Sequence, residues 1–381
     1  MQYKNQGPLE PTIGALGKKG EPISLAEEIA LEQSLKINDP LADDPFLIGD
    51  SSYWQELQQL SLPELIAEAR SYGESDIDDS ADRSELVFRV IKQRIRQSGQ
   101  MFFEGSLEIL PDEFGFLRSP DNYYQSRPDD IYVSPSQIRR FAIRNGSKVS
   151  GQIRPPKMNE RYFALLHVEA INHQDPNRQR SQPSFEEMVS IPPDEPLRLP
   201  PDDFAPSLRD AISSLNYGSA CLITGSAEKE NTLLMQRLVK SALTNDPNLF
   251  VLTLFLDKTE EEMRIKHEEL QGARCEVIGT YLGETVSRYV HLTDFMLEKA
   301  KRMVEYGKNV LFCLDSLNSL TKSKVLQHNE MGQENSLRLL HTARKTEKGS
   351  LTIIATTTDD FSNPENSENI QKQGIVRISL T

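Results

Sequence analysis

Two phenylalanines and a tyrosine on short strand-like stretches have the type and spacing of a base-stacking site. Phe114 and Phe116 lie two residues apart, so on a strand both rings point to one face of the sheet. Tyr132 stands in another such stretch, two positions after Asp130, and shares its face. Exposed aromatic rings on one face of a small barrel can stack on unpaired bases, each stack contributing about 1–3 kcal/mol. A place in the core is the ordinary alternative for an isolated Phe-X-Phe pair.

A second set of residues falls on the pattern of a phosphate-binding loop, Gly-X-X-X-X-Gly-Lys-Thr. Gly225 and Thr232 fit this pattern, but Glu230 and Asn231 stand at the second glycine and the lysine. A bound phosphate would meet a carboxylate and lose its lysine, and two like charges about 4 Å apart repel by about 4 kcal/mol at an effective dielectric of about 20. The loop is therefore expected to bind nucleotide poorly.

Lys229 and Asp315 are the other residues from which a nucleotide site could still be built. Lys229 lies two positions from the place of the missing lysine, so it could serve only in a shifted loop. Asp315 ends an apolar strand-like run, as does the carboxylate that holds Mg²⁺ in such sites, although a strand-end Asp that caps a turn is equally ordinary. Thr232 and Asp315 would be metal ligands only if a magnesium nucleotide binds.

Length and composition narrow the class of protein. A chain of 381 residues is long enough for two or three domains. The mean hydropathy is −0.50, and no apolar run approaches the roughly 20 residues of a membrane span, so no membrane association is expected. The N-terminus has no apolar signal region, which predicts a cytoplasmic location. Three widely spaced cysteines indicate neither a disulfide framework nor a zinc site.

Charge is distributed unevenly along the chain. The net charge of −14 argues against nucleic-acid binding over the whole surface. The stretch from Ser134 to Tyr162 nevertheless carries a single acid, Glu160, against seven basic residues: Arg139, Arg140, Arg144, Lys148, Arg154, Lys157 and Arg161. A local basic face on an acidic protein can bind RNA, because the potential at the groove governs encounter. A solvated basic surface is the alternative.

The pattern along the chain divides it into five parts. Residues 1–50 are acidic and lack a core, so disorder is expected, and 51–100 read as a helical module with helices near Leu60–Ala69 and Ser84–Gln97. Residues 101–173 hold five short strands, which predict a small barrel of the OB or cold-shock type. Residues 174–206, rich in Pro, Asp, Gln and Ser, are expected to be a linker.

Residues 207–381 alternate apolar strands with amphipathic helices, the signature of a parallel α/β sheet. The expected strands are 220–224, 250–256, 310–314, 351–356 and 375–380. The expected helices are 232–243, 259–270, 287–305 and 334–344. The predicted fold is thus multidomain, with a helical N-terminal module, a β-barrel and an α/β domain.

Residues 105–171 resemble the RNA-binding domain of the bacterial transcription termination factor Rho. The stretches that carry the resemblance are Gly105–Leu110, Phe114–Ser119, Pro128–Phe141, Ile153–Lys157 and Glu160–Leu166. The resemblance implies binding of pyrimidine-rich single-stranded RNA through stacking and hydrogen bonds to base edges. It implies stacking by Phe116, Tyr132 and Tyr162, with Phe114 on the same surface or just beneath it. The implied polar contacts are Arg118, Asp130, Lys157 and Glu160.

Residues 207–381 resemble the first part of the RecA-like ATPase of the same family, through Glu298–Glu305, Leu314–Leu320 and Gly349–Thr356. The family activity is that of an RNA-dependent ATPase and helicase that uses Mg-ATP. Lys258 stands where the family has the acid that activates water, and a charged lysine cannot accept a proton. The chain also ends at Thr381, before the family's arginine finger, adenine-stacking aromatic and pore loop, so an incomplete domain is expected.

Three hypotheses of function follow. The favoured one is a Rho-like single-stranded RNA-binding protein of transcription termination or its regulation, with no confident catalytic residue or cofactor, acting alone or as an oligomer with active Rho. The second is a divergent but active Rho, whose turnover Asp315→Ala would abolish. The third is a protein-interaction module, in which residues 1–50 contact Rho or RNA polymerase and RNA binding is secondary.

Overall fold

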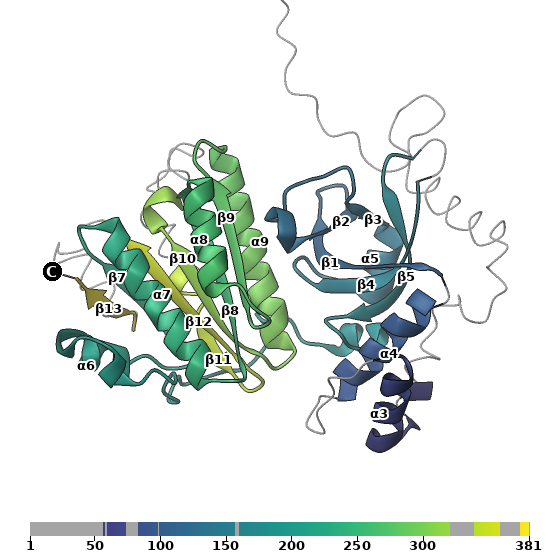
Figure 1. The fold of residues 1–381 in the computed structure, drawn as a ribbon, viewed down its shortest axis with the longest axis horizontal. Coiled ribbons are helices and arrows are strands. Elements are labelled where there is room, and N and C mark those ends of the chain that lie inside the picture. Colours follow the sequence, from purple (N-terminus) through teal and green to yellow (C-terminus); the bar gives the residue numbers. More distant parts are fainter. Residues whose placement is uncertain are drawn as a thin grey trace, which may run out of the picture. The chain divides into compact units, whose positions relative to one another are not determined.

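The computed structural model describes residues 56–73 without 58, 83–156 without 98, 160–320, 339–358 and 374–380. The acidic extension 1–50 and the first part of the helix expected at 334–344, up to residue 338, lie outside these ranges. The described chain divides into two compact units, which Figure 1 shows with their elements labelled. The first ends at Ser181 and lacks Pro120–Tyr124; the second comprises Pro120–Tyr124 and the residues from Gln182 onward.

The first unit begins with the helices α3 (Leu62–Ser71) and α4 (Arg83–Gln97). Helix α3 starts at a capping box, in which the Ser61 amide donates to Glu64 Oε2 over 2.7 Å, and a proline stands in its first turn. The apolar faces of the two helices pack together through buried residues: Leu65, Ile66, Ala69, Leu86, Val87, Val90 and Ile91. The expected helical module is therefore present.

A closed five-stranded barrel follows, in the order β1-β2-β3-β5-β4. Its strands are β1 (Met101–Ile109), β2 (Gly115–Arg118), β3 (Ile131–Val133), β4 (Lys148–Arg154) and β5 (Phe163–Ile171). Leu107, Leu117 and Ile131 face one another in register and fill the interior. Helix α5 (Pro135–Phe141), which begins at the Ser134 cap, adds Ile138 and Phe141 to the same core. The predicted barrel is confirmed.

The segment expected to be a linker, 174–206, carries short elements of its own. They are η2 (Pro176–Ser181), β6 (Ser190–Ile191), η3 (Pro201–Asp203) and, just beyond, η4 (Pro206–Leu208). Phe185 is fully buried in a core of the second unit, and its amide donates to Glu305 Oε1 over 2.7 Å. The later part of this segment is thus packed, because its scattered apolar side chains have a core to enter.

The second unit contains a sheet whose main path is wholly parallel, in the order β13-β7-β12-β10-β8-β9. Its strands are β7 (Ala220–Thr224), β8 (Leu249–Lys258), β9 (Cys275–Tyr281), β10 (Asn309–Asp315), β12 (Ser350–Thr357) and β13 (Val376–Ser379). Strand β11 (Arg344–Thr346) pairs antiparallel with β12 and with β6. The predicted α/β class is therefore confirmed.

Helices cover both faces of this sheet. They are α6 (Arg209–Ser213), α7 (Glu228–Asn245), α8 (Glu260–Leu270) and α9 (Val286–Glu305). Strand residues alternate between two cores, one shared with α9 and the other with α7 and α8. Cys221, Cys275 and Cys313 are buried free thiols, and burial raises the pKa of Cys221 to about 12.

Two predictions for this unit were incomplete. Strand β9 was missed, and the helix expected to run to Arg344 ends earlier, since Arg344 opens β11. Arg344 pairs with Leu351, and Lys345 pairs with Ser350, in a tight antiparallel connection. Pairing with a neighbouring strand therefore overrides the helical preference of this short polar run.

Candidate functional site

The rings implicated in RNA binding form one cluster on the outer face of the barrel. Phe116 lies opposite Tyr132 of β3 and opposite Glu108 of β1, so these three side chains share a face. The centroid of Phe116 lies 4.8 Å from that of Tyr162 and 5.8 Å from that of Phe114. This aromatic cluster (Phe114, Phe116, Tyr132 and Tyr162) is separate from the interior core of the barrel.

The aromatic cluster is more closed than the exposed platform expected from the sequence. Phe114, Phe116 and Tyr162 are 4%, 5% and 8% exposed. Neighbouring rings meet edge to face, an arrangement that aromatic quadrupoles favour, and each covers part of the next. A base that stacks on Phe116 must therefore displace one of its neighbours.

A glycine makes the hairpin beneath this cluster possible. A Cβ on Gly115 would lie 2.6 Å from the Glu108 carbonyl oxygen and 2.7 Å from Leu107 Cδ1. Strands β1 and β2 can approach to this distance only because position 115 has no side chain. The Phe-Gly-Phe pattern thus combines two outward rings with a close contact between strands.

Arg118 connects the aromatic cluster to two buried carboxylates. Its Nε donates to Glu108 Oε2 over 2.6 Å, its Nη1 donates to Asp130, and its guanidinium lies 5.1 Å from the Phe116 ring centroid. Burial raises the pKa of Asp130, although the adjacent Arg118 opposes this change. Arg118 and Asp130 thus form a buried ion pair, and their expected contacts to RNA stay a prediction.

Of the remaining polar residues of the expected site, the structure describes Glu160. Glu160 accepts two hydrogen bonds from Arg154, one of 2.8 Å from Nη2. The exposed Arg161 guanidinium lies 5.4 Å from the Tyr162 ring centroid. Lys157 lies outside the described residues. Glu108 was missed from the sequence; its register position opposite Phe116 is the signal that could have found it.

The altered phosphate-binding loop connects β7 to α7. Asn231, at the place of the lysine, is fully buried, and its Nδ2 donates to the carbonyls of Gly225, over 3.0 Å, and Thr357, over 2.9 Å. A Cβ on Gly225 would lie 2.5 Å from Asn231 Oδ1, so the amide fills the inside of the loop. Lys229 and Glu230 are exposed on the first turn of α7.

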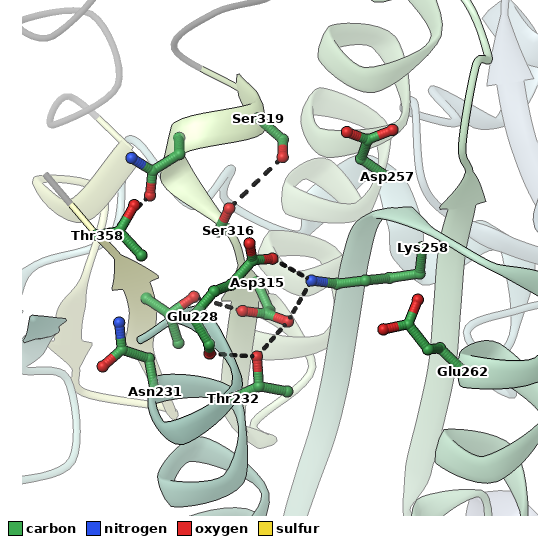
Figure 2. Close-up of polar contacts among 12 residues, drawn as sticks. Glu228, Asn231, Thr232, Asp257, Lys258, Glu262, Asp315, Ser316, Ser319 and Thr358 are labelled. Carbon is green, nitrogen blue, oxygen red and sulfur yellow. Dashed lines mark hydrogen bonds and ion pairs between the residues drawn. The ribbon is translucent and has the colours of Figure 1, made fainter. Parts of the chain in front are cut away.

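Lys258 reaches the carboxylate that was expected to hold magnesium. Its Nζ lies 3.1 Å from Asp315 Oδ2 and 2.6 Å from Glu228 Oε1, as Figure 2 shows. Thr232 Oγ1 donates to the same Asp315 oxygen over 2.9 Å. The other Asp315 oxygen accepts from Thr356 Oγ1 over 2.6 Å. Thr232 and Asp315 are thus brought together, but around an ammonium group.

The network formed by Lys258, Asp315, Glu228 and Thr232 places one cation beside two carboxylates. Burial alone would lower the pKa of Lys258, but the attraction of Asp315 and Glu228 outweighs it, so this pKa lies above its ordinary value. The ammonium occupies the space beside the two oxygens to which Mg²⁺ would bind. The donor set therefore does not fit a magnesium nucleotide. Within the described ranges, no group of three or more His, Cys, Asp or Glu side chains is placed to hold a metal.

Comparison with known proteins identifies the family. A family model described as "Rho termination factor, RNA-binding domain" matches residues 103–177, which include the barrel and the aromatic cluster. The transcription termination factor Rho of Rhodopirellula baltica is 39% identical over 366 residues, covering 91% of this chain and 71% of that protein. This chain belongs to the Rho family.

Other Rho proteins match this chain with similar sequence identity and coverage. Rho of Escherichia coli K12 is 36% identical over 320 residues, covering 79% of this chain and 75% of that protein. Among solved structures, the type III secretion ATPase EscN of enteropathogenic E. coli is 20% identical, with a TM-score of 0.40 and coverage of 51% of this chain and 49% of that one. In the described part of this Rho-family chain, no helix has the length and apolar character to span a membrane.

Proposed function

We propose that this Rho-family protein binds pyrimidine-rich single-stranded RNA in transcription termination or its regulation, and that its α/β unit does not hydrolyse ATP. The observation that carries the proposal is the contact of Lys258 with Asp315 and Glu228, next to a phosphate-binding loop filled by Asn231. A cytoplasmic location is part of the same proposal.

The aromatic cluster supports the RNA-binding half of the proposal. Unstacked bases bind proteins by stacking on rings and by hydrogen bonds to their edges. The carboxylate of Glu160, near Tyr162 in the chain, could accept from the amino group of cytosine, which uracil lacks.

The charge arrangement supports the loss of ATP hydrolysis. Phosphoryl transfer depends on a lysine, a magnesium ion and a group that orients the attacking water. In this degenerate Walker A motif, an uncharged amide replaces the lysine, and the ammonium of Lys258 lies where a base and a metal are needed. A triphosphate entering this site would also meet the carboxylates of Glu228 and Glu230.

The deciding experiment measures ATP hydrolysis by the purified protein with and without poly(C), alongside RNA binding. We expect binding without turnover, and loss of binding in the double variant Phe116→Ala/Tyr132→Ala. Turnover that rises with RNA and disappears in Asp315→Ala would establish the alternative, an active RNA-dependent ATPase. That alternative draws support from the retained contact between Thr232 and Asp315.

A protein-interaction module remains the third candidate, with Rho or RNA polymerase as its partner. It predicts that capture of the partner survives Phe116→Ala/Tyr132→Ala and is lost when residues 1–50 are deleted. These residues lie outside the described ranges, so the structure gives this candidate no separate support.

A further inference from the structure

The basic stretch of the sequence separates into two groups in the folded barrel. Lys148 pairs with Glu104 over 2.6 Å, and Arg154 pairs with Glu160. Arg139 and Arg140 are exposed on α5, and Arg144 is half-buried just beyond it. The RNA-binding function proposed above could involve Lys148 and Arg154, but it gives no role to the second group on and after α5.

Two further arginines join this second group from a distant part of the chain. Helix η2 lies against α5, because Arg180 Nε donates to the Arg140 carbonyl over 2.6 Å and Gln179 Nε2 donates to the Ala142 carbonyl over 3.4 Å. Arg178 and Arg180 are exposed. The resulting arginine surface consists of Arg139, Arg140, Arg144, Arg178 and Arg180.

The arginine surface is locally free of acidic residues in its own segments. Neither Pro135–Asn145 nor Pro176–Ser181 contains an Asp or Glu. On a protein with a net charge of −14, such a concentration of guanidinium groups marks a place where a polyanion can approach. Guanidinium groups also bind phosphate oxygens in a bidentate manner that lysine cannot reproduce.

The arginine surface begins next to the aromatic cluster. Arg139 Nη1 lies 2.9 Å from Glu113 Oε2, and Glu113 directly precedes Phe114. Both side chains of this pair are largely exposed, so the pair is weak and exchangeable. A strand whose bases enter the cluster can therefore continue past Arg139 onto α5 and η2.

We propose that the arginine surface binds the phosphate backbone of the RNA strand beyond the bases held by the aromatic cluster. This inference rests on the proposed RNA-binding function. It assigns the cluster to short-range base recognition and the arginines to affinity that grows with RNA length. An acidic protein is the other polyanion that such a surface could accept.

The test compares a cytidine tetranucleotide with an oligocytidine of about 12 nucleotides, a length within the range that one OB fold covers. The full-length chain is altered as Arg140→Glu/Arg178→Glu, with Arg140→Gln/Arg178→Gln as the milder variant. Arg237→Glu/Arg264→Glu, on exposed positions of α7 and α8, is the matched control. Affinities are measured over a series of salt concentrations.

We expect tetranucleotide binding to be unchanged and binding of the longer RNA to weaken about tenfold in the charge-reversed variant at moderate salt. The salt dependence of log affinity should become shallower by about 1.4, because each lost phosphate contact on a single strand contributes about 0.7. The neutral variant should show a smaller loss that is again confined to the longer RNA, and the control should match the unaltered protein.

Three outcomes would overturn the inference. One is unchanged affinity and salt slope for the longer RNA, the result that an acidic protein partner would give. Another is an equal loss for both RNA lengths in the neutral variant, which would show that the arginines support the fold of the barrel. In both cases the proposed function would stand. Failure of the unaltered protein to bind either RNA would overturn both proposals.

Discussion

Lys258 Nζ and Asp315 Oδ2 lie 3.1 Å apart at the ends of the neighbouring parallel strands β8 and β10. The Lys258 side chain is 7% exposed and the Asp315 side chain is fully buried. Strand ends of a parallel sheet are where such folds place their ligands. Here one strand end supplies the cation that satisfies the carboxylate of the next.

Removing the cation should destabilise the second unit strongly. Lys258→Met leaves Asp315 as a buried charge whose nearest cation is gone, and breaking such a pair costs about 3–5 kcal/mol. Urea unfolding measures the change in the free energy of unfolding. Lys240→Met, which breaks the exposed pair with Glu269, is the control and should cost less than about 1 kcal/mol. Equal losses in the two variants would contradict this role of Lys258.

A substitution of Asp315, the second member of the pair, tests whether the two charges stabilise each other. In Lys258→Met/Asp315→Asn neither charge remains, so the double variant should be more stable than the sum of the single changes predicts. A loss that equals this sum would show that the two charges act independently.

Restoring the missing lysine alone should not restore nucleotide binding. Asn231→Lys removes the two hydrogen bonds to Gly225 and Thr357, and it leaves the ammonium of Lys258 beside Asp315. We expect no rise in the unfolding temperature when Mg-ATP is added, since a ligand stabilises only the state that it binds. The triple variant Glu230→Gly/Asn231→Lys/Lys258→Glu, in contrast, should show a rise in the unfolding temperature when Mg-ATP is added. A rise with Asn231→Lys alone would mean that Lys258 does not exclude the nucleotide.

Gly115→Ala should damage the barrel as well as RNA binding. The added Cβ would enter the contact between β1 and β2, and overpacking of this kind typically costs about 1–3 kcal/mol. Thermal unfolding should show the loss, together with weaker poly(C) binding. Gly272→Ala, at a position with open space around it in the second unit, is the control and should change neither property.

The stability of the first unit should fall as the pH rises above neutrality. His173 lies between Glu85 and Glu104, at 2.8 and 3.0 Å, and stacks on Phe88. Burial lowers the pKa of His173, but its two carboxylate partners outweigh this and raise it. The stability that charged His173 provides is complete below its unfolded pKa of about 6.5 and is lost as the pH rises through its raised folded value.

Glu169 acts in the same direction. Burial raises its pKa from 4.5 to about 7, so its ionisation destabilises the fold over that interval by about 3 kcal/mol. Glu85 acts in the opposite direction. Its hydrogen bond to His173 is the chief cause that lowers its pKa to about 2, so the stability that Glu85 provides is lost as the pH falls below 4.5. We therefore expect maximum stability of this unit near pH 5.

Thermal unfolding between pH 4 and 8 measures this profile. Glu169→Gln should flatten the decline above pH 5, and His173→Gln should lower stability mainly below neutrality. Lys148 and Arg89 also contact this group of carboxylates. Equal slopes in the unaltered protein and Glu169→Gln would contradict the assignment to Glu169.

The sequence predicted those strands and helices whose own residues form a clear apolar pattern. Strand β7 was predicted with its observed bounds because Ala220–Thr224 is a continuous apolar run, as buried parallel strands require. Strand β9 was missed because Glu276 and Gly279 interrupt its apolar run. Strand β11 has no pattern of its own and exists through its pairing with β12.

The aromatic cluster and the network around Lys258 could be predicted from the sequence only in part. The spacing of Phe114 and Phe116 was enough to place both rings on one face, but it could not show that neighbouring rings cover them. The contact of Lys258 with Asp315 depends on β8 lying beside β10, an order fixed by the packing of the whole sheet. Sequence therefore revealed which functional groups the loop lacks, and the fold revealed what takes their place.

The network around Lys258 bears on how such a chain can change over evolutionary time. An acid at position 258 would place three carboxylates together, with Asp315 and Glu228, and like charges at this distance repel strongly. An acid introduced at position 258 alone therefore passes through a less stable protein, so this position can change to an acid at low cost only together with its partners.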